Sequence, residues 1–481
     1  MTRWEVIVKY LGYVLLFNAF FFYISAAISF FLHENSLTPL LYSAVVCTIL
    51  GSFPQIFVER IEEINFREGL EISVLGWILT CFAGAVPYFM WGGEFTFANA
   101  LFESVSGYTT TGATILRDVE TLTKGLLFWR ASTHFIGGVG IILFVLLILP
   151  SATGTRSSIY NSELSGLSKL NFKMRTRQIA RVIVVVYLSL IIIEIALLWV
   201  LGMNFFDAIC HAFATVATGG FSTKNLSVAY YDSVWIEVVI MTFMLLGSIH
   251  FGLLYGTVTG NKMNVFTSKS VRTYIGLMFL GIIVVAAKLT NDGFYSWWTS
   301  LRYASFQVIS LGTTTGFATV DTPNWPILTI IIIMYFTIQC GMVGSTSGGL
   351  KFDRVLLFYQ SLKRQIKLVL HPSGVYITKL ENVVISTEME LQTAIFFIIY
   401  LVTLFVTALL LSSMNVDGMT SISASIATIG NAGPGFGKVS SLGNYSSIPD
   451  AGKYVLSINM LLGRLEIINV FALFTVLTYK K

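Results

Sequence analysis

Ser106-Gly107-Tyr108-Thr109-Thr110-Thr111-Gly112-Ala113-Thr114 is a hydroxyl- and glycine-rich stretch between two apolar runs, each long enough to cross a membrane. One such phrase would fit any surface turn, but similar phrases recur at residues 215–222, 312–318 and 428–435. The four phrases align on the glycines at 112, 219, 316 and 433, which are 107, 97 and 117 residues apart. Recurrence at near-regular spacing predicts an internal fourfold repeat.

The composition is that of an integral membrane protein. Hydrophobic residues make up 55% of the 481 residues, charged residues 11%, and the mean hydropathy is +0.76. A soluble protein carries about 25% charged residues. The net charge of +5 is modest and gives no indication of a nucleic-acid partner. The four cysteines lack paired spacing and are interpreted as small buried hydrophobic residues: Cys47, Cys81, Cys210 and Cys340.

Hydropathy predicts an all-α membrane fold with ten transmembrane helices. Two spans, 6–32 and 40–58, form an N-terminal helical hairpin outside the repeat. Each repeat then has a span, a short amphipathic helix, the glycine phrase and a second span. Crossing about 30 Å of hydrocarbon takes about 20 helical residues, so we expect the short helices to belong to re-entrant pore loops. The short helices are 97–108, 205–215, 295–311 and 419–428, between spans 72–91 and 126–149, 182–201 and 234–258, 274–289 and 327–343, and 391–412 and 454–478.

The predicted units are the hairpin and four tandem repeats around a pseudo-fourfold central pore. Their boundaries are 1–68, 69–160, 161–265, 266–375 and 376–481. Loop charge gives the orientation, because lysines and arginines concentrate on the cytoplasmic side. The basic segments 156–181 and 351–379 fall on the same side as both termini. We therefore expect both termini in the cytoplasm and the four pore loops entering from outside.

The repeated phrase has the chemistry of a cation filter. A monovalent cation that leaves water needs oxygen ligands arranged in advance, and backbone carbonyls supply them where glycine allows the necessary angles. Threonine hydroxyls add oxygens, and the C-terminal end of each short helix favours a nearby cation. Four strands surround one ion, and here one chain supplies all four. The predicted ion-binding residues are Thr110, Thr111, Gly112, Ala217, Thr218, Gly219, Thr314, Thr315, Gly316, Asn431, Ala432 and Gly433.

Over essentially its whole length the chain resembles the Trk/Ktr/HKT superfamily of potassium transporters, and its hairpin and length are similar to the bacterial TrkH/TrkG branch. Three further motifs carry the resemblance: an arginine-led helix with a Gly-Gly pair at 128–141, a glycine-rich break followed by lysine at 341–351, and Gly463-Arg464-Leu465-Glu466. The fourth phrase departs from the pattern, because Asn431-Ala432-Gly433 has no threonine before its glycine. Strict selection of potassium over sodium is therefore open at that quadrant.

The resemblance implies the membrane subunit of a potassium uptake system in the bacterial cytoplasmic (inner) membrane. Flux of K⁺, and of Rb⁺, would be channel-like, with K⁺ as the substrate, no enzymatic activity and no organic cofactor. The resemblance also implies a homodimer in membrane lipid and a cytoplasmic nucleotide-binding regulatory subunit of the TrkA type. The basic segments 156–181 and 351–379 are its candidate docking faces. Proton or sodium coupling stays open.

A glycine-rich interruption and one arginine are the candidate gating elements. Each glycine costs about 1 kcal/mol in a helix, so the second span of repeat three is predicted to break. A glycine hinge for helix packing is the alternative; the resemblance favours an intramembrane loop that closes the pathway. Arg464 lies among apolar residues, and Glu466 faces another side of its helix, so a pore-facing guanidinium is favoured over an ion pair between them. The candidate gating residues are Gly341, Gly344, Ser345, Thr346, Gly348, Gly349, Lys351 and Arg464.

Other functions compete with this interpretation. His134, His211, His250 and His371 lack ligand spacing, which favours packing or loop positions over a metal site or proton relay. A broken-helix secondary transporter of another small solute would show twofold repeats and acids at mid-membrane depth, whereas Glu194 is nearly alone in that position. A membrane-embedded enzyme would need a clustered catalytic set, which the sequence does not show. A sodium-permeable cation transporter also remains an alternative.

Overall fold

The computed structural model describes residues 3–59, 64–148, 176–260, 264–381 and 383–471. Most of the basic segment 156–181 lies outside the described residues. The described part of the chain consists of helices and one two-stranded antiparallel hairpin. The elements are α1 (Trp4–Phe31), α2 (Leu37–Phe57), α3 (Phe66–Trp91), α4 (Phe97–Tyr108), α5 (Lys124–Ile148), α8 (Thr176–Val200), α9 (Phe205–Val216), α10 (Val234–Ser248), α11 (Phe251–Val258), α12 (Lys269–Asn291), α13 (Trp297–Gly312), α14 (Ile327–Gln339), α15 (Phe352–Leu370), β1 (Lys379–Leu380), β2 (Val383–Val384), α16 (Thr387–Ser413), α17 (Gly418–Ile429) and α18 (Asp450–Leu465).

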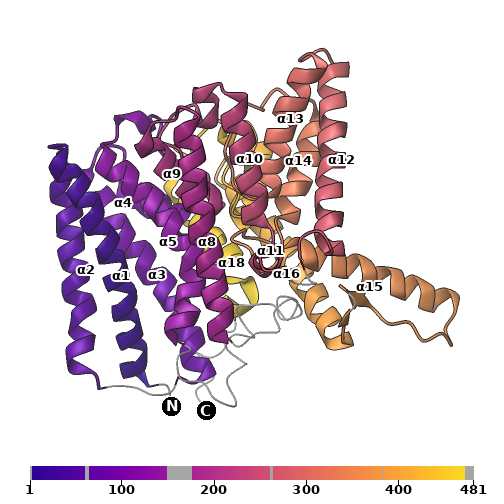
Figure 1. Cartoon of the computed structure of the whole chain (residues 1–481), viewed down its shortest axis with the longest axis horizontal. Coiled ribbons are helices and arrows are strands. Elements are labelled where there is room, and N and C mark those ends of the chain that lie inside the picture. Colours follow the sequence, from indigo (N-terminus) through magenta and orange to yellow (C-terminus); the bar gives the residue numbers. More distant parts are fainter. Residues whose placement is uncertain (1–2, 60–63, 149–175, 261–263, 382, 472–481) are drawn as a thin grey trace.

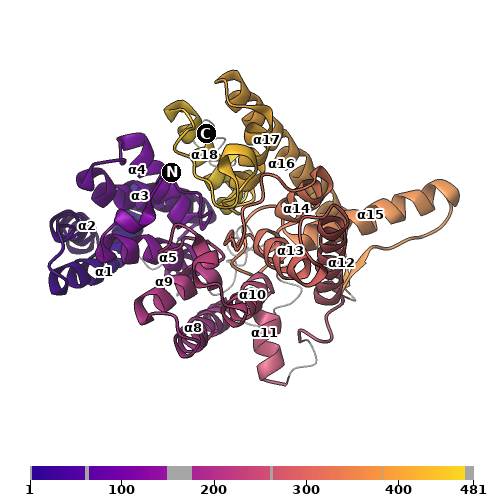
Figure 2. The same ribbon diagram turned by 90° about the horizontal axis from the view of Figure 1, so that it is seen from above.

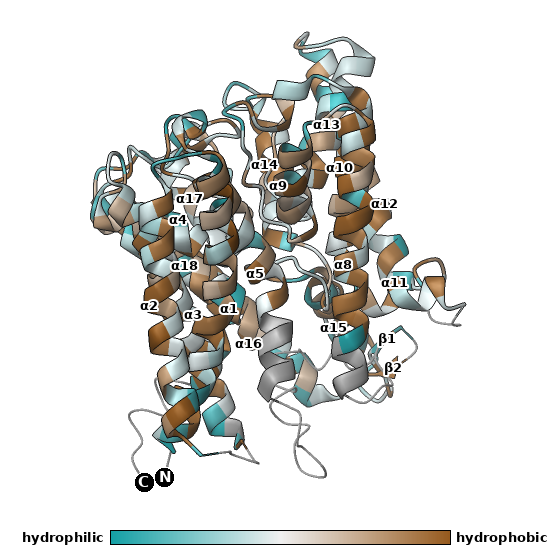
Figure 3. Cartoon of the chain, turned by 60° about the vertical axis from the view of Figure 1, so that its left-hand side comes forward, coloured by the Kyte–Doolittle hydropathy of each residue, from teal (hydrophilic) through white to brown (hydrophobic). Residues whose placement is uncertain are grey.

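The helices form an upright bundle around a common centre (Figure 1). Seen from above, α1 and α2 lie at one edge of the bundle, and α15 projects away from it on the other side (Figure 2). Hydrophobic residues run along the long helices, whereas hydrophilic residues gather in the loops at the two ends (Figure 3). This distribution is the one expected of helices whose outer faces meet lipid.

Six helices of the described chain are long and apolar enough to cross a membrane: α1, α2, α3, α8, α12 and α16. The pair α10–α11 would make a seventh span, although it bends by 107°. Several apolar helices of membrane length support a multi-pass membrane protein, while the predicted total of ten spans stays a prediction.

The N-terminal hairpin packs tightly and is fixed to the rest of the bundle. At the crossing of α1 and α2, a methyl group on Gly12 would lie 2.7 Å from the carbonyl oxygen of Gly51, so the two backbones are in contact. On the other side of α1, the Phe22 ring stacks on Trp129 of α5 with centroids 3.8 Å apart. The hairpin therefore supports the first short helix and its partner α5 from outside.

The four short helices lie where the sequence predicted them, to within two residues at each end: α4, α9, α13 and α17. Side chains at the N-cap explain three of their starts, because Thr96, Asn204 and Asp417 each accept a hydrogen bond from a backbone N–H of the first turn. At Asp417 this bond from Thr420 also lowers the pKa of the carboxyl group.

Three of the predicted second spans are interrupted. The interruption after 327–339 was predicted from its glycines, whereas those within 234–258 and 454–478 correct the continuous helices expected there. The first breaks between α10 and α11 at Ile249, the second ends at Gln339, and the third turns at Glu466, where φ is 62°. The first two breaks support each other: the N–H of Met342 donates to Ser248 O at 2.9 Å, and the N–H of Phe251 donates to Gly344 O at 3.1 Å. Backbone groups freed by one break are thus satisfied by another segment.

Candidate functional site

Each short helix ends in the same turn and leads into a ring segment, which we define as residues 109–112, 217–220, 313–316 and 430–433. The second residue of each segment has a positive φ: 51° at Thr110, 56° at Thr218, 64° at Thr314 and 53° at Asn431. The next N–H donates to the carbonyl five residues earlier at 2.7–2.9 Å in all four. This is the hydrogen bond of a Schellman turn, where glycine is usual. Threonine there is strained, because β-branched residues rarely adopt this conformation.

Each ring segment ends in a glycine that also has a positive φ: 80° at Gly112, 76° at Gly220, 85° at Gly316 and 80° at Gly433. The sequence alignment placed Gly219 in this set, and the structure corrects that register by one residue. Gly219 has no positive φ and occupies the position held elsewhere by Thr111, Thr315 and Ala432. Both registers fit the sequence because Gly219 and Gly220 are adjacent.

The four segments close into a ring through these glycines. A methyl group on each glycine would collide with a carbonyl oxygen of the next segment, and the fourth segment returns to the first. The distances would be 2.0 Å from Gly112 to Gly219 O, 2.1 Å from Gly220 to Thr315 O, 2.2 Å from Gly316 to Ala432 O, and 2.4 Å from Gly433 to Thr111 O. Glycine is therefore required at each of these four positions for two reasons. The positive φ disfavours other residues, and the carbonyl of the next segment leaves no room for a side chain.

The side chains at the strained positions are all buried, yet each has a different partner. The Thr110 hydroxyl has no partner among the described residues, whereas the Thr218 hydroxyl donates to its neighbour Ala217. The Thr314 hydroxyl lies 2.9 Å from that of Ser347. Asn431 donates its amide to Thr111 Oγ1 at 3.0 Å. The ring is thus regular in its backbone and unequal in its side-chain contacts.

A loop of residues 340–351, between α14 and α15, lies against the strained ends of the segments. Besides the Ser347–Thr314 contact, the Thr346 hydroxyl donates to Val216 O at 2.8 Å, at the C-terminal end of α9. A methyl group on Gly348 would lie 2.4 Å from Oδ1 of Asn431. The loop therefore contacts the second, third and fourth parts of the ring. The predicted break in this stretch is confirmed, since no helix covers these residues.

Arg464 fastens the loop to α5. Its guanidinium donates from Nη1 to Thr346 O at 2.5 Å and from Nη2 to Gly137 O at 2.7 Å. Glu466 pairs with Arg354 at 2.7 Å instead, so the inference that Glu466 is not the partner of Arg464 is confirmed. The other predicted gating cation, Lys351, donates from Nζ to Ser347 O. Two cations thus bind backbone carbonyls of the loop itself.

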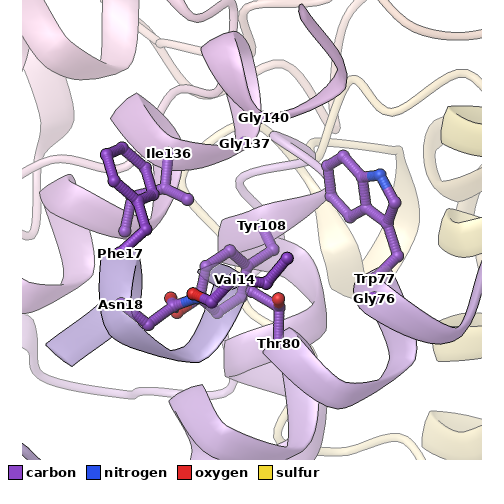
Figure 4. A pocket seen from close by; sticks show the side chains of 10 residues that line it. All are labelled: Val14, Phe17, Asn18, Gly76, Trp77, Thr80, Tyr108, Ile136, Gly137 and Gly140. Atoms are coloured by element: carbon purple, nitrogen blue, oxygen red, sulfur yellow. The ribbon is translucent and has the colours of Figure 1, made fainter. Parts of the chain in front are cut away.

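A cavity of about 200 Å³ lies beside the Arg464 contact, between α1, α3, α4 and α5. Its wall includes Trp77, Tyr108 and Gly137, and Figure 4 shows these residues around the space. The Trp77 ring centroid is 6.0 Å from the Arg464 guanidinium carbon. Tyr108 donates its hydroxyl to Asn18 Oδ1 at 2.5 Å. The arginine that holds the loop is therefore close to an unfilled region of the bundle.

A second, polar cavity of about 70 Å³ lies at the other end of the segments. Three of the ring glycines line it, namely Gly112, Gly220 and Gly433, together with Arg130 and Ser440. The terminal glycines of the ring segments therefore face a polar cavity, whereas the residues with strained φ, such as Thr314 and Asn431, face the loop 340–351.

Two of the predicted histidines, His134 and His211, form hydrogen bonds next to the ring segments. His134 lies between Gly107 O, 2.8 Å from Nδ1, and the N–H of Phe221, 3.1 Å from Nε2. These partners fix a neutral ring with its proton on Nδ1. His211 contacts Asp207 O and the Ser222 hydroxyl in the same manner. Among the described residues no three metal-ligating side chains lie together.

Sequence reasoning missed a buried ion pair next to the ring. Arg130 of α5 donates to Glu103 of α4 at 2.6 Å, and both side chains are almost fully buried. Glu103 also accepts from the N–H of Ile115 at 3.0 Å, just beyond the first ring segment. The signals available in the sequence were a glutamate in the middle of an apolar short helix and the arginine near the start of the apolar span 126–149.

Comparisons with known proteins agree with this architecture. The TrkH family, described as cation transport protein, matches residues 40–480. The Trk system potassium uptake protein TrkH of Escherichia coli K12 is 35% identical over 418 residues, which cover 86% of each chain. TrkI of Halomonas elongata, with the same description, is 29% identical over 100% of this chain and 98% of its own. The crystal structure of the potassium transporter TrkH from Vibrio parahaemolyticus covers 100% of both chains with a TM-score of 0.89 and 29% identity. The chain therefore belongs to the TrkH family of cation transport proteins.

Proposed function

We propose that this chain takes up potassium ions across the bacterial cytoplasmic membrane through the ring of four segments. The observation that carries the proposal is the closed ring itself, in which each glycine lies against a carbonyl of the next segment. In this proposal the closely packed segments form a narrow passage lined by backbone oxygens. The names of the relatives, which are potassium uptake proteins, give the same substrate.

The chemistry of the ring suits a monovalent cation that has lost its water. Backbone carbonyls and hydroxyls replace the hydration shell without a formal charge that would hold the ion too tightly. The C-terminal ends of four helices add partial negative charge around the centre. The proposed ion-binding residues are those predicted from the sequence, with Gly220 added as the terminal glycine of the second segment and Gly219 kept at the position of Thr111, Thr315 and Ala432.

The wider arrangement in this proposal is an N-terminal hairpin and four tandem repeats, with ten spans in all and both termini in the cytoplasm. Permeation would stop where the loop 340–351 contacts the ring, held there by Arg464 and Lys351. A cytoplasmic nucleotide-binding subunit of the TrkA type would move this loop through α15, which follows it directly. We also propose that the chain works as a homodimer in membrane lipid.

Ion flux through the purified protein in liposomes tests this function. Uptake of K⁺ and Rb⁺ driven by a membrane potential should exceed uptake of Na⁺, and Gly112→Ala should remove it. Equal Na⁺ flux would favour a sodium-permeable cation transporter. Flux of an organic solute with no K⁺ conductance would favour a secondary transporter and refute the proposal.

A further inference from the structure

Each short helix carries a polar side chain at nearly the same position on the helix. Three of these residues precede the cap of their helix by six positions and the fourth precedes it by seven. They are Glu103 before Thr109, His211 before Ala217, Gln307 before Thr313 and Ser423 before Gly430. All four are buried, with at most 2% of their surface exposed. Three different residue types thus share one position, and a fourth type lies one residue earlier on its helix.

These side chains all form hydrogen bonds with the chain segment that follows the ring glycine. We call this segment the return strand. Glu103 accepts from Thr114 Oγ1 at 2.9 Å, and His211 Nε2 lies 3.1 Å from Ser222 Oγ. On the third helix, Gln307 donates to the carbonyl of residue 320 at 3.1 Å. On the fourth, Ser423 exchanges two 2.9 Å hydrogen bonds with the backbone of residue 436. Each short helix therefore fixes its own return strand through one side chain. We call these four side chains, Glu103, His211, Gln307 and Ser423, the struts.

The first strut differs because it is charged and reaches the second segment. Arg130 neutralises Glu103 and also donates to the carbonyl of Ser222 at 2.9 Å, on the second return strand. Its guanidinium lies 3.6 Å from the centroid of the Phe221 ring. A buried pair is weak evidence for stability, because its desolvation offsets its attraction. Because Arg130 binds Glu103 on one side and the Ser222 carbonyl on the other, it instead fixes the first and second segments relative to each other.

We propose that these four side chains and Arg130 are positioning residues that set the spacing of the ring, so that discrimination between K⁺ and Na⁺ depends on them. This inference rests on the proposed function. None of the five needs to touch the ion: they hold the return strands, and the return strands hold the ring carbonyls. A ring free to contract around Na⁺ would lose the difference between the two ions, because its oxygens could then replace the hydration shell of the smaller ion as well.

Three variants test the struts separately, with K⁺ and Na⁺ flux measured in liposomes. Gln307→Leu removes the third strut without changing charge, and Ser423→Ala removes only one hydroxyl. The double variant Glu103→Gln with Arg130→Met removes the link between the first and second segments, and avoids the isolated buried charge that either single change would leave. Gln307→His supplies the residue type that the second helix uses.

A matched control is the pair Arg302–Glu237, which joins α13 to α10 with contacts of 2.7 and 2.8 Å. Arg302 also contacts the exposed Asp232 just before α10, and the pair forms no hydrogen bond with residues 114, 222, 320 or 436. The control double variant Arg302→Met with Glu237→Gln should keep the wild-type permeability ratio. Each strut variant should lower the K⁺/Na⁺ ratio by about tenfold, equivalent to about 1.4 kcal/mol, while still conducting K⁺. Gln307→His should retain selectivity.

Unchanged selectivity in folded Gln307→Leu and Ser423→Ala would overturn the inference, and so would an equal loss in the control pair. If the Glu103–Arg130 variant does not fold, these two single variants still decide the question. Absence of K⁺ flux in the unmodified protein is a different result, because it would refute the proposed function and not the role of the struts.

Discussion

Alanine at Gly220 should abolish ion flux, although the change adds one methyl group. The φ of 76° costs an L-residue about 1–2 kcal/mol. The larger effect is steric, because the new Cβ would lie 2.1 Å from Thr315 O. A carbon–oxygen contact normally needs about 3.3 Å or more, so the second and third segments must separate by roughly 1 Å. The obstacle is backbone on both sides, and no side-chain rotation relieves it.

The assay measures K⁺ flux into liposomes driven by a membrane potential, and size-exclusion chromatography checks that the variant is folded. Gly140→Ala is the matched control, because its methyl group would meet only Trp77, at 3.8 Å, which is ordinary contact. Gly219→Ala should also impair flux, since its Cβ would lie 2.5 Å from the His134 ring. That obstacle is a side chain, so adding His134→Ser should restore part of the flux. No second substitution should rescue Gly220→Ala; wild-type flux in Gly220→Ala would refute the corrected register and the ring drawn from it.

Three further outcomes follow from the contacts around the ring. Arg464→Ala removes both hydrogen bonds that hold the loop and a fixed positive charge near the pathway, so K⁺ flux should rise; slower flux at normal expression would indicate a structural role. Deleting residues 344–348 should give high flux that no longer responds to a regulatory subunit, and full regulation in the shortened protein would remove the loop from gating. In the β1–β2 hairpin, burial opposes ionisation of Glu381, but hydrogen bonds from Ser268 and Ser270 outweigh it and lower the pKa below its usual 4.5. A lowered pKa stabilises the hairpin above pH 4.5, and this contribution is lost as the pH falls through the lower folded value. The protection factors of residues 379–381 and 383–385 in hydrogen exchange, corrected for the intrinsic rate at each pH, should therefore fall on acidification, and Glu381→Gln should remove most of this pH dependence.

The short helices were predictable from the sequence because their signals are local. A capping side chain such as Asp417 begins the helix, an apolar face covers about three turns, and a hydroxyl- and glycine-rich phrase ends it. Membrane hydropathy added the constraint that so short a helix cannot span. The glycines at 341–349 likewise predicted a break by their helix propensity alone.

The breaks at Ile249 and Glu466 were not predictable in the same way. The sequence around each is apolar enough for a continuous span, and neither has a proline; the glycines near Ile249 are spread over 247–256, less dense than those at 341–349. At Ile249 another segment satisfies the freed backbone groups, as Gly344 O does for the N–H of Phe251. At Glu466 the side chain pairs with Arg354 of α15. Such partners come from distant parts of the chain, so local hydropathy cannot predict them.

The second ring segment shows a different limit of sequence reasoning. Gly219 and Gly220 are adjacent, and an alignment on glycine alone cannot choose between them. The choice is made by the neighbours, since Thr315 O excludes any side chain at Gly220, whereas His134 fills the space beside Gly219. The struts went unnoticed for a related reason: Glu103 and Gln307 share a helix position but no chemical type, so only their contacts reveal the common role.

The unequal sequences of the four segments correspond to unequal contacts with the loop. In all four segments a residue with a positive φ is followed two positions later by glycine. Asn431 adopts this φ with less strain than threonine does, because its short polar side chain tolerates a positive φ. Its amide then binds Thr111 and joins the fourth segment to the first. Thr314 alone bonds the loop through its side chain, at Ser347. A loop that withdrew would therefore remove the side-chain contact of the third segment, which packs through backbone against both the second segment at Gly220 and the fourth at Ala432.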